Sequence, residues 1–172
     1  MVQKVYFDTS VWLAPYDSPH SRSDQAQVVA SIERICNGHK VGRLQLFTST
    51  KVLEEMHNQL SNPEKSAKAS KALKHIDELQ IGRLPRAPAD FGKAIFGEAR
   101  YGVAPKFRDI PEHDKDKDVI EYATENELDF FVSLDERHIL NEFTKRQLES
   151  RLRSEGTKVV TPQELARILF SN

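Results

Sequence analysis

The sequence contains a single cysteine, Cys36, and carries a net charge of only −1. With one cysteine, the chain cannot form an intramolecular disulfide or a zinc site built from cysteines. The near-zero net charge excludes a strong basic field over the whole surface, so nucleic-acid binding would have to use local basic patches. No hydrophobic run approaches the length that crosses a bilayer, and the first residues enter a strand pattern directly. We therefore expect a cytoplasmic protein with no membrane association.

Strands and helices alternate along the whole sequence. The chain has 172 residues, of which 38% are hydrophobic and 30% charged, as is typical of one globular domain with a substantial core. The patterns predict strands at about 3–7, 43–49, 79–86, 130–133 and 157–161. Helices are predicted at about 10–13, 24–37, 50–60, 64–79, 89–102, 115–127, 138–152 and 162–170. This alternation predicts an α/β fold with a central, mostly parallel sheet flanked by helices, in one domain spanning 1–172.

Single residues set some of the expected boundaries. Thr9 or Ser10 is expected to cap the first helix, and Gly38 is expected to end the second. The aromatic residues in and beside the first strand are expected in the core: Tyr6, Phe7 and Trp12.

The stretch 114–135 is expected to bring two acids to one edge of the sheet. A helix over 115–127 would run about 18 Å, and the buried strand FFVS would return about 16 Å. Asp135, just past the strand, is therefore expected near Asp116 at the helix start. Functional groups in a parallel α/β sheet gather beyond the carboxyl ends of the strands. Asp8, which follows the first strand, is expected at the same edge.

Helical phase selects among neighbouring acids, at about 100° per residue. Glu55 flanks the predicted buried stripe of the helix over 50–60, whereas Glu54 points away from it. On the later helix Asp116 shares its phase with the apolar positions, whereas Asp114 and Asp118 fall on the other side. The candidate site is therefore Asp8, Glu55, Asp116 and Asp135.

Four carboxylates at one place would repel one another unless a cation neutralised them. Oxygen ligands of this kind indicate Mg²⁺ or Mn²⁺, which would activate a water and direct it at a phosphodiester. Each acid also has an ordinary structural role open to it, because Asp8 and Asp135 can cap helices and the other two can belong to solvated helix faces. Their joint placement at one edge favours the metal site over these separate roles.

Several motifs, taken in order, resemble the PIN domain: KVYFDTSVWL, TSTKVLEEM, DKDVIEYA, DFFVSLDERHIL and KVVTPQELARIL. The resemblance covers essentially the whole chain. It implies a five-stranded parallel sheet and a metal-dependent endoribonuclease, with metal-binding and catalytic roles for the four acids above and a supporting hydroxyl role for Ser10. Many members are VapC-like toxins, so it also implies an RNA substrate, a small antitoxin partner and a homodimer.

One position departs from the family pattern. Many relatives have a further Asp two residues after the fourth acid, where this chain has Arg137. Arg137 lies close to Asp135 in the sequence, so it suits contact with an RNA phosphate, and Lys106 and Arg108 are also expected near the acid edge. The lysines that recur along 65–74 read instead as a solvated helix face. A PIN-like module without activity, which binds RNA or protein, remains the alternative function, and an acid-rich phosphatase is a weaker one.

Overall fold

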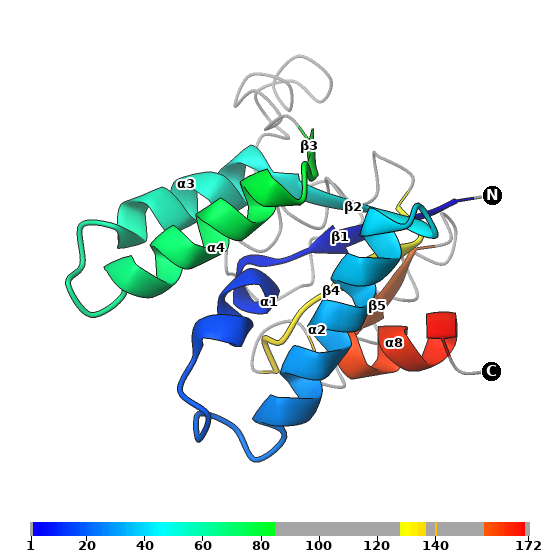
Figure 1. The fold of residues 1–172 in the computed structure, drawn as a ribbon, viewed down its shortest axis with the longest axis horizontal. Coiled ribbons are helices and arrows are strands. Elements are labelled where there is room, and N and C mark those ends of the chain that lie inside the picture. The colour runs from blue at the N-terminus through cyan, green and yellow to red at the C-terminus, as the bar shows by residue number, and fades with distance from the viewer. Residues whose placement is uncertain (1, 85–127, 137–139, 141–156, 171–172) are drawn as a thin grey trace, which may run out of the picture.

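The computed structural model describes residues 2–84, 128–136, 140 and 157–170. Within them, five strands form one sheet in the order β3-β2-β1-β4-β5 (Figure 1), and every pairing is parallel. The strands are β1 (Gln3–Phe7), β2 (Leu44–Ser49), β3 (Gly82–Leu84), β4 (Phe130–Val132) and β5 (Lys158–Val160). The prediction of an α/β fold with a parallel sheet flanked by helices is confirmed.

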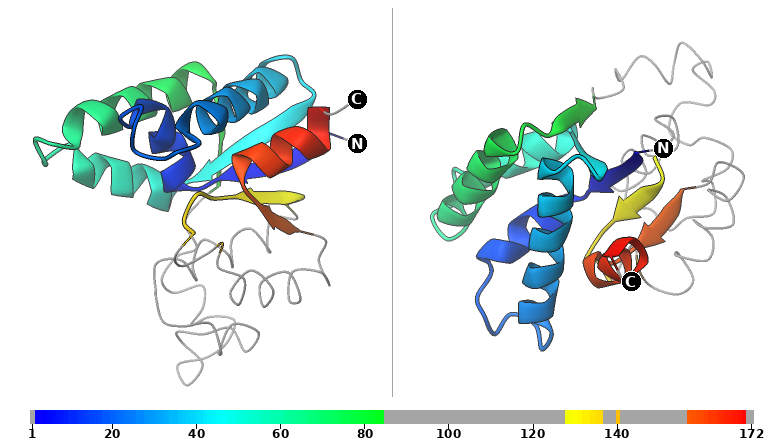
Figure 2. Two further views of the ribbon diagram at one scale, coloured as in Figure 1. Left: turned by 90° about the horizontal axis from the view of Figure 1, so that it is seen from below. Right: turned by 45° about the vertical axis from the view of Figure 1, so that its right-hand side comes forward.

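The helices follow the strands as the sequence pattern predicts. They are α1 (Thr9–Leu13), α2 (Gln25–Lys40), α3 (Thr50–Gln59), α4 (Ser66–Glu78) and α8 (Pro162–Phe170), with the 3₁₀ helix η1 (Ala14–Tyr16) after α1. In Figure 2, α2 and α8 lie side by side over the sheet, and the two helices are in contact. None of the helices in this part of the chain is long and apolar enough to span a bilayer. The helices predicted over 89–102, 115–127 and 138–152 fall outside the described residues, apart from Leu140.

The central strand β1 lies at the middle of the core. Its Val5, Tyr6 and Phe7 are fully buried, as a strand covered on both faces requires. The Tyr6 ring stacks on Phe131 of β4, with ring centroids 5.3 Å apart. Trp12, only 1% exposed, packs edge-on against Phe7 at 5.0 Å. The core positions predicted for the aromatic residues around β1 are thus confirmed.

The helix end predicted at Gly38 is wrong, because α2 continues to Lys40. Gly42, at φ +72°, ends the helix instead. The Gly42 amide donates to the His39 carbonyl at 3.0 Å, and the Arg43 amide donates to the Gly38 carbonyl at 2.9 Å. This pair of bonds with a left-handed glycine is the Schellman helix end.

Gly38 is a glycine for a different reason, which is close packing. A Cβ added to Gly38 would lie 2.9 Å from Cζ of Phe170 and 3.1 Å from Cδ2 of Leu44. The missing side chain therefore lets the Phe170 ring of α8 rest directly on the α2 backbone. Sequence pattern alone does not distinguish a glycine that ends a helix from one that admits a neighbouring ring.

Replacing Gly38 should reveal this packing role. We expect Gly38→Leu to lower the free energy of unfolding by about 2 kcal/mol, because overpacking against Phe170 and Leu44 outweighs the gain in helix propensity. Ala30→Leu on the exposed side of the same helix is the matched control, and it should change stability by less than about 0.5 kcal/mol. Urea unfolding followed by circular dichroism measures both. Equal stability of the two variants would contradict the packing role.

Candidate functional site

Strands β1 and β4 are neighbours, and the chain leaves them toward opposite sides of the sheet. β1 is followed by β2 and β3 on one side, whereas β4 is followed by β5 on the other. Open parallel sheets place their ligand sites at such a switch point, beyond the carboxyl ends of the strands. Phe7 and Val132, the last residues of the two strands, are aligned in register. Asp8 and Ser133 therefore enter the switch point side by side.

The Asp8 carboxylate is held by donors from both strand ends. Its Oδ1 accepts from the Thr9 amide at 2.7 Å, and its Oδ2 accepts from the Ser10 hydroxyl at 2.9 Å and the Ser133 hydroxyl at 3.0 Å. Asp8 itself is the N-cap of α1, in extended conformation. The expectation that Thr9 or Ser10 caps this helix is therefore wrong. The carboxylate takes that position, which leaves the Ser10 hydroxyl to orient it.

Glu55 is joined to the same strand end through Thr9. The Thr9 hydroxyl donates to Oε2 of Glu55 at 2.6 Å, so the first residue of α1 is bonded to the middle of α3. Ser49 caps α3, its hydroxyl accepting from the Val52 amide at 3.2 Å. Glu55 is partly buried while Glu54 is exposed, as the helical phase predicts.

The segment after β4 is fixed to the end of β1 by two serine hydroxyls. The Leu134 amide donates to Ser10 Oγ at 3.0 Å, and the Asp135 amide donates to Ser133 Oγ at 3.1 Å. The Asp8 amide also donates to the Val132 carbonyl at 3.1 Å. Asp135 itself is partly buried. These bonds bring Asp8 and the backbone of Asp135 to one place.

Arg22 holds this segment from the side of the loop between η1 and α2. Its Nη1 donates to the Leu134 carbonyl at 3.5 Å, and its Nη2 forms an ion pair with Glu136. Its Nε pairs with Asp24 at 3.1 Å, and Asp24 also accepts from Gln163 of α8 at 2.7 Å. The position of Asp135 thus depends on contacts from three separate parts of the chain.

Two partly buried rings, those of Tyr16 and His75, lie beside Trp12 of α1. The Tyr16 hydroxyl and His75 Nδ1 are 3.2 Å apart, and the His75 ring lies edge-on to Trp12 at 6.3 Å. Desolvation lowers the pKa of His75, and desolvation likewise raises the pKa of Tyr16. Both side chains therefore favour their neutral forms, which suits packing against α1, the helix that carries Thr9 and Ser10.

Three of the four predicted acids belong to the described residues, and Asp116 does not, nor does Arg137. In the part of the chain that the structure describes, no group of three or more His, Cys, Asp and Glu side chains is arranged to hold a metal ion. The side chains joined at this place nevertheless offer only oxygen ligands: the carboxylates of Asp8 and Glu55, both bonded to Thr9, and the hydroxyls around Asp8. This chemistry fits Mg²⁺ or Mn²⁺, which need only one or two protein carboxylates and keep several waters.

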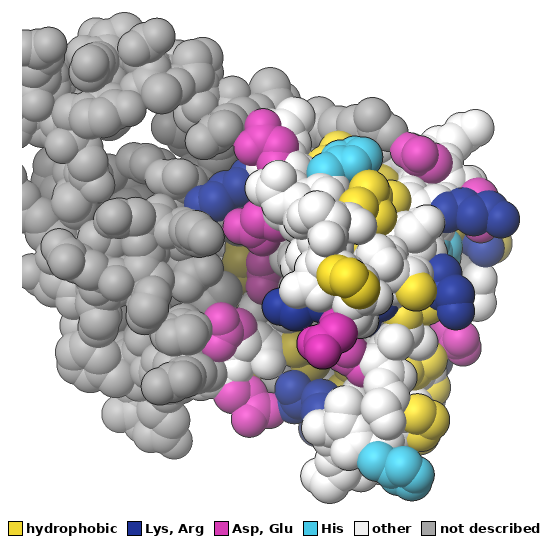
Figure 3. All heavy atoms as spheres, turned by 90° about the vertical axis from the view of Figure 1, so that its left-hand side faces the viewer, with side chains coloured by type: hydrophobic (Ala, Val, Ile, Leu, Met, Phe, Trp, Pro, Cys, Tyr) yellow, Lys and Arg dark blue, Asp and Glu magenta, His cyan; other side chains and the backbone are white. Residues whose placement is uncertain are grey.

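The surface around the carboxyl ends of the strands is acidic along one border. Figure 3 views the molecule from the side toward which the strands run, and several Asp and Glu side chains, with a Lys or Arg side chain among them, lie beside the grey atoms. The lysines of α4 are partly engaged elsewhere, because Lys68 forms an ion pair with Asp17 and Lys74 lies 3.7 Å from Glu78. These ion pairs agree with the interpretation of the lysines along 65–74 as part of an ordinary solvated helix face.

Sequence reasoning missed three residues of this arrangement: Thr9, Ser133 and Arg22. Thr9 adjoins Asp8 in the motif DTS, and Ser133 lies two residues before Asp135 in the motif SLD, so a search for hydroxyls around the acids would have found both. Arg22 lies in a loop with no pattern of its own, and its contact with Leu134 joins residues far apart in sequence. No sequence signal points to it.

The comparison with known proteins does not add a family to this geometry. No family model matches the chain, and no curated protein matches its sequence.

Proposed function

We propose that this protein is a PIN-type endoribonuclease that uses Mg²⁺ or Mn²⁺ to hydrolyse RNA phosphodiester bonds. The observation that supports it best is the placement of Asp8. The carboxylate lies at the switch point between β1 and β4, and hydroxyls from both strand ends orient it at 2.9 and 3.0 Å. An acid that only capped α1 would need a backbone amide at the start of that helix, whereas the Asp8 carboxylate also accepts the hydroxyls of Ser10 in α1 and of Ser133 after β4.

In this proposal each site residue has a distinct task. Asp8 and Asp135, together with Asp116, would hold the ion, which when bound lowers the pKa of an attacking water and neutralises charge on the scissile phosphate. Glu55, oriented by Thr9, would hold the ion or accept the proton of the water. Ser10 and Ser133 fix the Asp8 carboxylate, and Arg137 would contact a phosphate of the RNA.

The sequence resemblance extends the proposal to biological role. VapC-like proteins are toxins, so we propose that the chain is the toxin of a toxin–antitoxin pair, forms a homodimer and is inhibited by a small antitoxin protein.

Metal removal tests the proposal directly. We expect cleavage of a labelled RNA to stop in excess EDTA and to return when Mn²⁺ is added in excess of the chelator. Mn²⁺ should also raise the melting temperature saturably, since a ligand at a hundred times its Kd stabilises the folded state by about 2.7 kcal/mol. Full cleavage in EDTA would contradict the mechanism. If the protein binds RNA but does not cleave it, and Mn²⁺ does not raise its melting temperature, the inactive RNA-binding module is favoured instead.

A further inference from the structure

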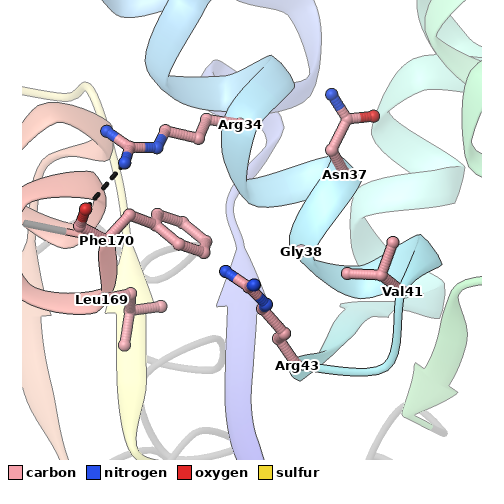
Figure 4. A pocket seen from close by; sticks show the side chains of 7 residues that line it. All are labelled: Arg34, Asn37, Gly38, Val41, Arg43, Leu169 and Phe170. Atoms are coloured by element: carbon pink, nitrogen blue, oxygen red, sulfur yellow. Dashed lines mark hydrogen bonds between the residues drawn. The ribbon is translucent and has the colours of Figure 1, made fainter.

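A pocket of about 260 Å³ lies between the last turns of α2 and α8. It adjoins the amino end of β2, whereas the candidate site lies beyond the carboxyl ends of the strands. Figure 4 shows Phe170 pointing from α8 toward α2, with the guanidinium groups of Arg34 and Arg43 on either side of its ring. Leu169 and Val41 add apolar surface to the pocket, and none of its lining residues is acidic.

Arg34 is joined to Phe170 by two contacts. Nη2 of Arg34 donates to the Phe170 carbonyl at 2.7 Å, and its guanidinium carbon lies 5.0 Å from the centre of the Phe170 ring. Gly38 supports the opposite side, because its missing Cβ leaves room for the ring edge. Arg34 therefore has a structural role, because it donates to a carbonyl at the end of α8. That role does not explain the presence of Arg43.

Arg43 is held at the pocket by its backbone while its side chain remains available. Its amide is bonded to the Gly38 carbonyl at 2.9 Å in the turn that ends α2. Its side chain is exposed, and no carboxylate in the described part of the chain pairs with it. Val41, in the same turn, also lines the pocket and is 70% exposed. Two cations and the apolar side chains of Val41, Leu169 and Phe170 thus line one small hollow.

We propose that this pocket binds an acidic peptide segment of a partner protein. An apolar side chain of the peptide would enter against Phe170 and Leu169, and a carboxylate would pair with Arg43. Arginine and aromatic residues around a small pocket are the usual composition of an interface centre. The volume is below that of ordinary small-molecule sites, and it suits one inserted side chain.

The geometry favours a peptide over RNA. A stacked nucleobase needs an open ring face, but Arg34 covers one face of the Phe170 ring, the Arg43 guanidinium lies on its other side (Figure 4), and the Gly38 backbone meets its edge. An apolar side chain needs only the remaining edge and the neighbouring Leu169. The inference does not depend on nuclease activity, because no residue of the candidate site lines this pocket.

Fluorescence anisotropy with a labelled acidic peptide, DELFED, tests the proposal on the full chain. We expect saturable binding that weakens roughly tenfold in Arg43→Glu, since reversing one contacted charge costs on the order of 1.4 kcal/mol. Arg167→Glu, on an exposed position of α8 outside the pocket, is the matched control and should leave binding unchanged. Melting temperatures establish that both variants fold.

Other results would overturn the proposal. Failure of the peptide to bind at about 1 mM, or equal binding by Arg43→Glu, would exclude an acidic peptide at this pocket. Binding of a labelled oligouridine that displaces DELFED and is lost in Arg43→Glu would assign the pocket to RNA. A dimer that dissociates only in Arg43→Glu, with no peptide binding, would assign it to a second copy of the chain.

Discussion

Asp8→Asn should reduce RNA cleavage by roughly a hundredfold or more while the protein stays folded. The change removes the negative charge that the proposed metal ion requires, and a metal ion supplies several kcal/mol of transition-state stabilisation, at tenfold in rate per 1.36 kcal/mol. The helix cap survives, because Asn is as good an N-cap as Asp and its carbonyl oxygen can accept the Thr9 amide bond. Ser10 and Ser133 can rotate their hydroxyls to suit the new amide.

Asp129→Asn is the matched control for this loss. Asp129 precedes β4 at the opposite end of the sheet, and its carboxylate likewise accepts a backbone bond, from the Lys4 amide at 2.7 Å. Initial rates on a labelled RNA in Mn²⁺, with circular dichroism for folding, should separate the two variants. If Asp8→Asn cleaves as fast as Asp129→Asn, Asp8 is only a helix cap and the proposed mechanism fails.

The strands were predictable because their signal is local. FFVS and KVYF are apolar runs without alternation, and a strand buried on both faces of a parallel sheet requires such runs. The end of α2 was mispredicted because a glycine at position 38 can either end the helix or leave room for a neighbouring side chain. Its actual role depends on Phe170, which lies far along the chain and meets it only after α8 packs on α2.

In the candidate site, too, local sequence patterns selected the acids but did not predict the tertiary contacts that orient them. Asp8 and Glu55 were selected from strand ends and helical phase, and the structure joins both to Thr9. The bonds that orient them are between hydroxyls and acids of different elements, and periodicity carries no information on such pairs. Ser133 is the clearest case, because its hydroxyl serves both the Asp8 carboxylate and the Asp135 amide. A serine beside an acid gains this role only when two strands end together.

Thr9→Val should lower RNA cleavage by about 10–100-fold, the usual cost of removing a group that orients a metal ligand. The Thr9 hydroxyl donates to Oε2 of Glu55 at 2.6 Å, and Val keeps the shape of Thr while losing this donor. Glu55 would then lose its fixed orientation toward the strand end. The expected signature is a higher Mn²⁺ concentration for half-maximal rate, which a purely structural role for Thr9 would not produce.

Thr9→Ser restores a hydroxyl at the same position and should recover most of the activity and the original Mn²⁺ dependence. Glu55→Gln provides the second comparison, since Thr9→Val should have little further effect once the carboxylate is gone. Glu54→Gln, which changes the exposed neighbour on the same helix, should behave as the unaltered protein. Two results would show that the hydroxyl does not work through Glu55. One is an equal loss of cleavage in Thr9→Val and Thr9→Ser. The other is that Thr9→Val lowers the cleavage rate by the same factor in the Glu55→Gln protein as in the unaltered protein. The 2.6 Å bond would then be a structural link between the end of β1 and α3 alone.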